Sequence, residues 1–306
     1  MDYTRIIQTA IETPWAILPG KLLAIQHLLT IRAAGERLTA DDVRAAVDAA
    51  APRRAPTVAG GVAVIPIVGT IIPRADMLSE SSGAVSVQSL TKQLRQALAD
   101  PEVGSIVLDI DSPGGQVSGV DELSTEIYNS RGQKPIRAVA NSLAASAAYW
   151  IASAADEVVV TPSGEVGSIG VLAMHEDISG MLETEGVKVN IVSAGKYKVE
   201  ANPFAPLTDE ARGAIQARVD DYYTMFTAAV ARNRGVKRAE VVGGFGEGRV
   251  VGAKQAVNLG MADKIGTFDE VITRLIGGRG RRRAAADIDF RRRRLRLAEN
   301  TDTPLR

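Results

Sequence analysis

The chain has 306 residues, of which 45% are hydrophobic and 24% are charged, a composition typical of a globular protein with one large domain or two smaller ones. It contains no cysteine and only two histidines, which excludes disulfides, thiolate metal sites, a cysteine nucleophile and a multi-histidine metal centre. The 36 basic and 36 acidic side chains cancel, although residues 279–306 hold ten arginines against four acids.

The N-terminal 50 residues are predicted to form two or three short helices. The last of these covers residues 38–50, where Thr39 precedes an acidic first turn and can act as an N-cap. Residues 51–60 contain two prolines and are predicted to be a linker. No stretch supplies about 20 strongly apolar residues. The start of the chain also lacks the pattern of a signal peptide. We therefore expect no membrane anchor and a cytoplasmic location.

From Gly61 onward, apolar segments of strand character alternate with segments of helical character. Such alternation is typical of an α/β protein whose mostly parallel sheet is covered by helices. The predicted strands are residues 61–72, 105–111, 136–141, 157–162, 169–174 and 187–194. The predicted helices are residues 86–100, 116–130, 143–155, 179–186, 208–233, 252–259 and 268–276. A compact domain over residues 61–278 is expected, followed by the tail 279–306.

The motif DSPGG, residues 111–115, follows directly after an apolar strand. Its two glycines allow a turn with positive φ, so their N–H groups could point at a developing negative charge. An ordinary turn between a strand and a helix has the same composition. The motif alone leaves both interpretations open.

Ser146 lies where a predicted strand gives way to a helix of small residues. A serine at such a place has unpaired backbone N–H groups beside it, including that of Ala147, and a helix dipole that favours an oxyanion. A serine in an alanine-rich helix is also a common structural residue. If Ser146 is a nucleophile, it needs a base.

Two kinds of base are available downstream of Ser146. His175 is one, and the lysine pair Lys196 and Lys198 is the other. A lysine has a pKa of about 10.4 in water, so it acts as a base only where apolar burial lowers that value. Ser168 could hydrogen-bond a lysine amine. Each lysine is equally compatible with an ordinary surface cation.

The arginine-rich tail has two interpretations. It has little apolar material to bury, which is typical of a solvated, disordered end. It could also contact nucleic acid or an acidic protein surface through charge alone. It carries no set of side chains that would read a base sequence.

Six motifs in order resemble the S49 serine peptidases, the signal peptide peptidase A family. They cover about residues 61–276 and read IPIVGTI, SIVLDIDSPGGQV, AVANSLAASAAYWIASAAD, GEVGSIGV, SAGKYKVEANPFAPLTDEAR and GRVVGAKQAVNLGMADKIG. The resemblance implies a ClpP/crotonase-like fold and an acyl-enzyme mechanism with a Ser–Lys dyad, without metal or cofactor. It implies Ser146 as nucleophile, Lys198 as base, Ser168 as the residue that orients the lysine, and Gly114 with Ala147 as the oxyanion hole.

Within that family the layout resembles the head-maturation proteases of tailed phages and prophages. This resemblance implies protein substrates such as capsid, scaffold or portal protein, an oligomeric ring, and action inside a procapsid in the host cell. Family members often have glycines after the nucleophile, where this chain has Ala147 and Ala148; both are small and keep a backbone N–H. Three alternatives remain: a housekeeping protease of the signal-peptide-peptidase type, a crotonase-fold protein that is no peptidase, and a scaffolding protein.

Overall fold

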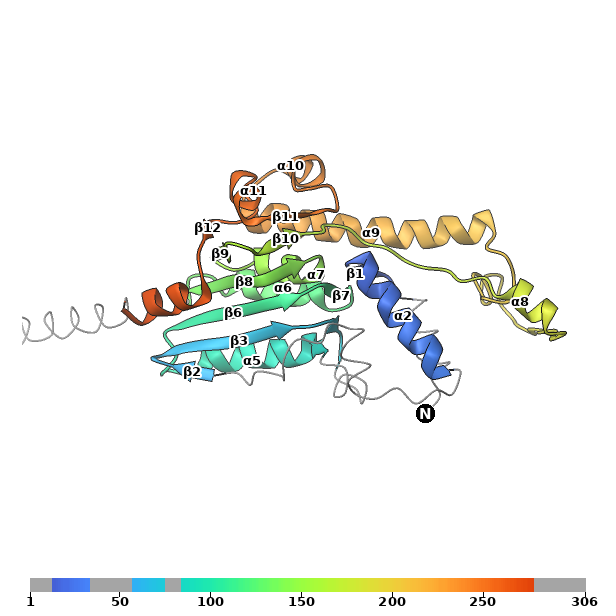
Figure 1. Cartoon of the computed structure of the whole chain (residues 1–306), viewed down its shortest axis with the longest axis horizontal. Helices are drawn as coiled ribbons and strands as arrows, with labels where there is room; N and C mark the ends of the chain where they lie inside the picture. The colour runs from blue at the N-terminus through green and yellow to red at the C-terminus, as the bar shows by residue number, and fades with distance from the viewer. Residues whose placement is uncertain (1–12, 34–56, 75–83, 278–306) are drawn as a thin grey trace, which may run out of the picture.

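The computed structural model describes residues 13–33, 57–74 and 84–277, and Figure 1 shows their arrangement. The predicted helix 38–50, most of the predicted linker and the arginine-rich tail lie outside the described residues.

The larger of two sheets has eight strands, with the path order β11-β10-β8-β6-β3-β2, and with β9 pairing both β8 and β12. These strands are β2 (Thr57–Ala59), β3 (Val62–Val68), β6 (Ser105–Ser112), β8 (Ile136–Ala145), β9 (Glu157–Val160), β10 (Glu165–Gly167), β11 (Val250–Gly252) and β12 (Lys264–Ile265). All of its pairings are parallel except β2 with β3 and β10 with β11. The predicted class, α/β with a mostly parallel sheet, is confirmed.

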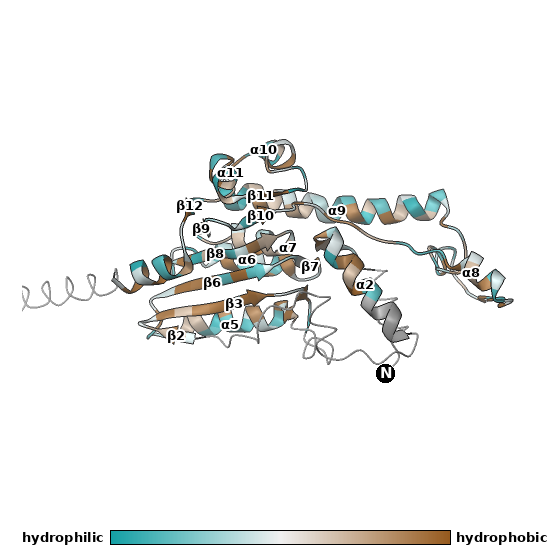
Figure 2. Ribbon diagram, in the orientation of Figure 1, coloured by the Kyte–Doolittle hydropathy of each residue, from teal (hydrophilic) through white to brown (hydrophobic). Residues whose placement is uncertain are grey.

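Helices cover the sheet on both faces. One face packs on α5 (Val87–Ala99), α6 (Val120–Asn129), α7 (Ala147–Ser153) and the C-terminal part of α9 (Asp209–Arg234). Because side chains alternate along a strand, Ile106 and Leu108 join this core, whereas Val107 faces the helical residues 268–277 on the opposite side. Figure 2 shows the central strands as largely hydrophobic and α9 as mixed.

The smaller sheet has four strands in the order β1-β7-β4-β5. They are β1 (Trp15–Ile17), β4 (Ile71–Ile72), β5 (Val85–Ser86) and β7 (Gly114–Gln116). Strand β1 comes from the N-terminal segment, which was expected to be helical, and it is followed by the helix α2 (Pro19–Ala33). Figure 1 shows β1 and α2 at the end of the large sheet near β7.

Several predicted elements differ from the observed ones. Residues 169–174 and 187–194 are not strands, although Leu172 forms an isolated bridge to Trp15. Residues 57–59 of the predicted linker form β2. Strand β8 continues to Ala145, so α7 is shorter than predicted. The smaller helices are α8 (Ser179–Thr184), α10 (Arg238–Gly244) and α11 (Ala253–Asn258).

The segment with α8 and the adjoining half of α9 projects away from both sheets (Figure 1). Residues 187–194 within it are extended and exposed, and Val192 is 98% exposed. Their alternating apolar pattern predicts a strand, but a strand needs a neighbouring strand to pair with, and none lies within reach in the described chain. Among the described helices, none is both long enough and apolar enough to cross a bilayer.

Candidate active site

Ser146 stands at the junction between strand β8 and helix α7, where it is the N-cap residue. Its backbone has φ 56° and ψ −119°, a conformation that is rare for any residue with a side chain. Its N–H donates to the carbonyl of Gly167 at 2.7 Å, and its hydroxyl donates to the carbonyl of Gly170 at 3.4 Å. The side chain is held in a tight turn between two strand ends, as a nucleophile on a sharp turn would be.

Gly114 lies directly beside Ser146. It has φ +99°, and a Cβ added to it would stand 3.0 Å from the Cβ of Ser146 and overlap the carbonyl oxygen of Ala16. Its N–H donates to the Ser112 hydroxyl at 3.2 Å. Ala147 is the first residue of α7, so its N–H has no acceptor within the helix. Gly114 and Ala147 thus flank the nucleophile candidate from two elements.

Ser168 follows strand β10, next to the residue that accepts the Ser146 N–H. It also has a positive φ, 52°, and its N–H donates to the carbonyl of Arg249 at 2.7 Å. Ser168 is buried, at 5% exposed. Ser146 and Ser168 are therefore brought together by the pairing of β8 with β10.

Lys198 lies in the projecting segment between α8 and α9, and its side chain is exposed. Its N–H donates to the carbonyl of Gly195 at 3.1 Å. The segment that carries it extends away from the end of the sheet where α7 begins (Figure 1). Among the described residues, the Ser146 hydroxyl donates to Gly170 and no hydrogen bond joins Ser146 to Lys198.

The neighbouring Lys196 is engaged in other interactions. Its ammonium group donates to the Tyr197 hydroxyl at 2.7 Å and to the Glu210 carboxylate at 3.0 Å. These two hydrogen bonds raise the pKa of Lys196, which keeps the amine protonated and opposes a role as base.

His175, the alternative base, is half-buried and its Nε2 lies 3.3 Å from the carbonyl oxygen of Asn202. It lines a cavity of about 530 Å³ between the segment after β10 and helix α9, together with Val171, Leu172, Ala173, Asp177, Leu207, Arg212, Ile215, Gln216 and Val219. No hydrogen bond joins His175 to Ser146 within the described part of the chain.

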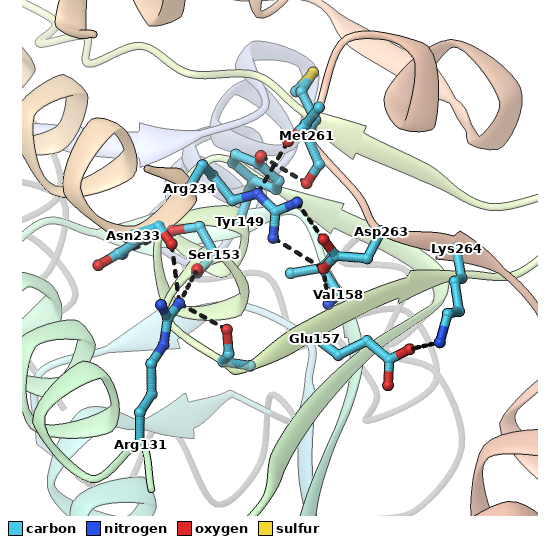
Figure 3. Close-up of polar contacts among 12 residues, drawn as sticks. Arg131, Tyr149, Ser153, Glu157, Val158, Asn233, Arg234, Met261, Asp263 and Lys264 are labelled. Atoms are coloured by element: carbon cyan, nitrogen blue, oxygen red, sulfur yellow. Dashed lines mark hydrogen bonds and ion pairs between the residues drawn. The ribbon is translucent and has the colours of Figure 1, made fainter. Parts of the chain in front are cut away.

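Helix α7 is fixed at its C-terminal end by Arg131, a residue that was not predicted from the sequence. Its guanidinium donates to the carbonyls of Ser153, Ala154 and Ala155 at 3.1, 2.9 and 2.7 Å, and to that of Asn233 at 3.0 Å (Figure 3). A cation at a helix C-terminus satisfies carbonyls that have no intrahelical partner. Burial lowers the pKa of Arg131, although this does not deprotonate an arginine.

A second group of polar contacts holds α7 against the C-terminal part of the domain. The buried Tyr149 hydroxyl donates to the carbonyl of Met261 at 2.9 Å, and burial raises its pKa. Arg234 forms two hydrogen bonds with Asp263, at 2.8 and 3.0 Å (Figure 3). Burial acts to raise the pKa of Asp263, but the hydrogen bonds from Arg234 and the Val158 N–H, together with the positive charges of Arg234 and Lys264, lower the pKa overall.

Among the described ranges, no group of three or more histidine, cysteine, aspartate or glutamate side chains is placed to hold a metal ion. The candidate site combines a serine in a strained turn, flanking backbone N–H groups and a second buried serine.

Comparison with known proteins connects this site to a family. Residues 129–280 match the sequence profile described as Peptidase family S49. Capsid assembly protease C of Escherichia phage lambda is 34% identical over 251 residues, which are 80% of this chain and 57% of that protein. Head-tail preconnector protein GP5 of Enterobacteria phage P21 is 36% identical over 222 residues, 72% of this chain and 44% of that protein.

More distant relatives belong to cells. Protease 4 of Salmonella typhi is 29% identical over 216 residues, 70% of this chain and 34% of that protein. The chain thus spans about half, or less, of the length of these curated relatives. A crystal structure of an enoyl-CoA hydratase/isomerase family member aligns with 75% of this chain and 77% of its own, at 16% identity and a TM-score of 0.44.

Proposed function

The chain belongs to peptidase family S49, and on that premise we propose that it is a serine endopeptidase in which Ser146 is the nucleophile and Lys198 the general base. The observation that carries the proposal is the geometry at Ser146. A serine with a strained backbone stands at the start of a helix, next to a positive-φ glycine with no side chain. That arrangement suits attack on a carbonyl whose oxygen is held by backbone N–H groups.

The reaction would proceed by acyl transfer. A neutral Lys198 amine takes the proton from the Ser146 hydroxyl while the oxygen attacks the peptide carbonyl. The N–H groups of Ala147 and of Gly114 stabilise the oxyanion, which requires the Gly114 N–H to turn from the Ser112 hydroxyl that accepts it in this structure. The lysine then gives its proton to the leaving amine, and water hydrolyses the acyl-enzyme by the same steps. In this scheme the Ser168 hydroxyl orients the lysine amine, and this role fits its buried position beside Ser146.

We further propose that the lysine comes from a neighbouring copy of the chain within a ring. Lys198 is exposed and sits in a segment that projects from the body that contains Ser146 (Figure 1). Val187, Val189, Ile191 and Val192 of the same segment are 42–98% exposed, which is unusual for an apolar run and favours burial against a partner. Docking there would also desolvate the lysine and so favour its neutral form.

The substrates we propose are proteins of a phage procapsid, namely capsid, scaffold or portal protein. Support comes from the two phage relatives, which are described as a capsid assembly protease and a head-tail preconnector protein. Action inside a procapsid in the host cell follows from this substrate class. A signal-peptide-peptidase role is the second candidate, because Protease 4 and a putative signal peptide peptidase are also relatives, at 29% identity. The arginine-rich tail would add charge-based contact with acidic protein or nucleic acid.

The dyad is tested by co-expressing the full chain with a capsid or scaffold protein encoded by a neighbouring gene and measuring cleavage of that protein. We expect Ser146→Ala and Lys198→Ala each to lower cleavage roughly a thousand-fold or more, whereas Lys196→Ala and His175→Ala stay close to wild type. Cleavage by both dyad variants at the wild-type rate would contradict the proposal. Loss of cleavage in His175→Ala alone would point to a histidine base.

Mixing the two inactive variants tests whether the dyad forms between chains. If Ser146 meets the lysine of a neighbour, a mixture of refolded Ser146→Ala and Lys198→Ala chains regains about a quarter of wild-type activity, by random assortment over identical interfaces. A dyad within one chain predicts no recovery in the mixture.

A further inference from the structure

Strand β1 lies across the candidate active site. On one side it pairs antiparallel with β7, with Ile17 opposite Gly114 and Trp15 opposite Gln116. On the other side Trp15 exchanges two backbone hydrogen bonds with Leu172, at 2.8 and 2.9 Å. Leu172 follows two residues after Gly170, whose carbonyl accepts the Ser146 hydroxyl. The N-terminal strand therefore fills the space between the two backbone segments that border the nucleophile.

This strand closes the site. Ser146 is 1% exposed and Ala16 is fully buried. A Cβ added to Gly114 would lie 2.2 Å from the carbonyl oxygen of Ala16 and 3.0 Å from the Cβ of Ser146, so the Ala16 carbonyl stands close to the Gly114 side of Ser146. A substrate carbonyl must reach Ser146 on the side of Gly114, so in this conformation the backbone of residue 16 occupies the approach.

The strand is held by a small separate cluster of apolar side chains. Trp15, Ile17 and Leu22 are 4%, 2% and 1% exposed, and they pack together with the partly buried Ile25, Leu172 and Met174. A hydrogen bond of 3.3 Å between Gln26 and Glu176 adds a contact from helix α2. Trp15, Ile17 and Leu22 form a cluster apart from the main core, whereas Ala16 packs in the main core. Because β1 is an end strand of the smaller sheet, we expect that β1 and α2 can leave without dismantling the larger sheet.

We propose that strand β1 is an internal occupant of the peptide-binding site, which keeps the enzyme closed until β1 is displaced. A protein substrate in extended form would take its place as an added strand on β7, since both offer the same backbone groups. Displacement of β1 by substrate or by an assembling neighbour would then open the site. This inference rests on the proposed peptidase function of Ser146.

The test measures access to residue 146 directly, without requiring catalysis. The chain has no cysteine, so Ser146→Cys places a single thiol in the full-length protein. Its reaction with a small aromatic disulfide reagent, dithiodipyridine, is followed by absorbance and compared with the unfolded chain. We expect slow reaction in Ser146→Cys alone, and reaction at least about ten-fold faster when Trp15→Ala is added, because loss of the large side chain favours the undocked strand.

Two further variants show whether a faster thiol reaction is specific to changes in β1 or follows from general destabilisation of the protein. Ile17→Ala is a milder change in the same strand and should also accelerate the reaction, should Trp15→Ala fail to fold. Leu90→Ala removes an equally buried side chain from α5, which lies outside the apolar cluster of Trp15, Ile17 and Leu22, and should leave the rate unchanged. Unchanged thiol reactivity in both β1 variants, or equal acceleration by Leu90→Ala, would overturn the inference.

The same β1 variants with Ser146 intact separate this inference from the proposed function. Faster cleavage of the co-expressed protein in Trp15→Ala and Ile17→Ala, in step with faster thiol reaction, supports both. Faster thiol reaction with no cleavage by any variant, wild type included, supports the closed site and refutes the peptidase function. Cleavage that depends on Ser146 together with an unchanged thiol rate keeps the peptidase and refutes the role of β1.

Discussion

Several residues near Ser146 have a positive φ. Ser142, Ser146 and Ser168 have φ of 115°, 56° and 52°, and Gly114 and Gly167 beside them have φ of 99° and 122°. A side chain in this region costs about 1–3 kcal/mol, so such conformations persist where the surroundings enforce them. Here the enforcing contacts are hydrogen bonds between strand ends, such as that from the Ser146 N–H to Gly167. The strain sets the hydroxyl at the meeting point of β8, β10 and β7.

Ser146→Gly tests this strain. Glycine adopts a positive φ without a steric penalty, so we expect the free energy of unfolding to rise by about 1 kcal/mol relative to Ser146→Ala, which keeps the Cβ. Urea denaturation of the two inactive variants measures the difference. Equal stability would mean that the turn at residue 146 stores no strain.

Residues that follow apolar strands could be predicted from the sequence, because the ends of parallel strands meet at one edge of a sheet. Gly114, Ser146 and Ser168 are predicted in this way and lie together in the structure. Arg131 could not be predicted, since its partners are backbone carbonyls whose positions depend on how α7 packs. The role of Lys198 stays a prediction from family resemblance.

Helix α7 is tied to its neighbours at both ends. Its N-cap residue Ser146 makes no side-chain capping hydrogen bond, but its N–H donates to the carbonyl of Gly167, and the C-terminal carbonyls of the helix bind the guanidinium of Arg131. Along its length Trp150 stacks on Phe226 of α9, with ring centroids 4.5 Å apart. The element is only seven residues long, too short to be stable alone, so its position depends on these neighbours. Sequence composition predicted the helix but made it too long, because Leu143 to Ala145 join β8.

Arg131→Met tests whether the hydrogen bonds from Arg131 to the C-terminal carbonyls of α7 stabilise the protein. The substitution keeps an apolar stem but leaves the carbonyls of residues 153–155 without a partner, so we expect a loss of about 2–4 kcal/mol in unfolding free energy. Arg131→Lys should recover only part of this, because an ammonium group cannot reach several carbonyls in one plane. Thermal unfolding checks both. A decrease of less than about 0.5 kcal/mol in the unfolding free energy of Arg131→Met would show that water satisfies these carbonyls as well as Arg131 does.

At the scale of the molecule, the domain has a buried body and an exposed arm. The sheet core contains fully buried valines, isoleucines and alanines, whereas the arm of α8 and residues 185–198 is exposed almost throughout. The alternating pattern of residues 187–194 predicts a strand, and within residues 13–33, 57–74 and 84–277 no strand pairs with it. A pattern of apolar residues indicates which side chains are buried in the functional oligomer. Residues 187–194 of this arm have the pattern of a buried strand. The difference between pattern and structure is therefore accounted for if a second copy covers the arm.

Val192→Glu tests this account of the arm. Val192 is 98% exposed in the single chain, so a charge there should change the unfolding free energy of the monomer by no more than about 0.5 kcal/mol. At an interface the same charge is costly to bury, and we expect the variant to sediment as a monomer and to lose cleavage. Val242→Glu, at an exposed valine of α10, is the matched control and should sediment as wild type does. An oligomer of unchanged size and activity in Val192→Glu would mean that residue 192 stays in solvent throughout the reaction.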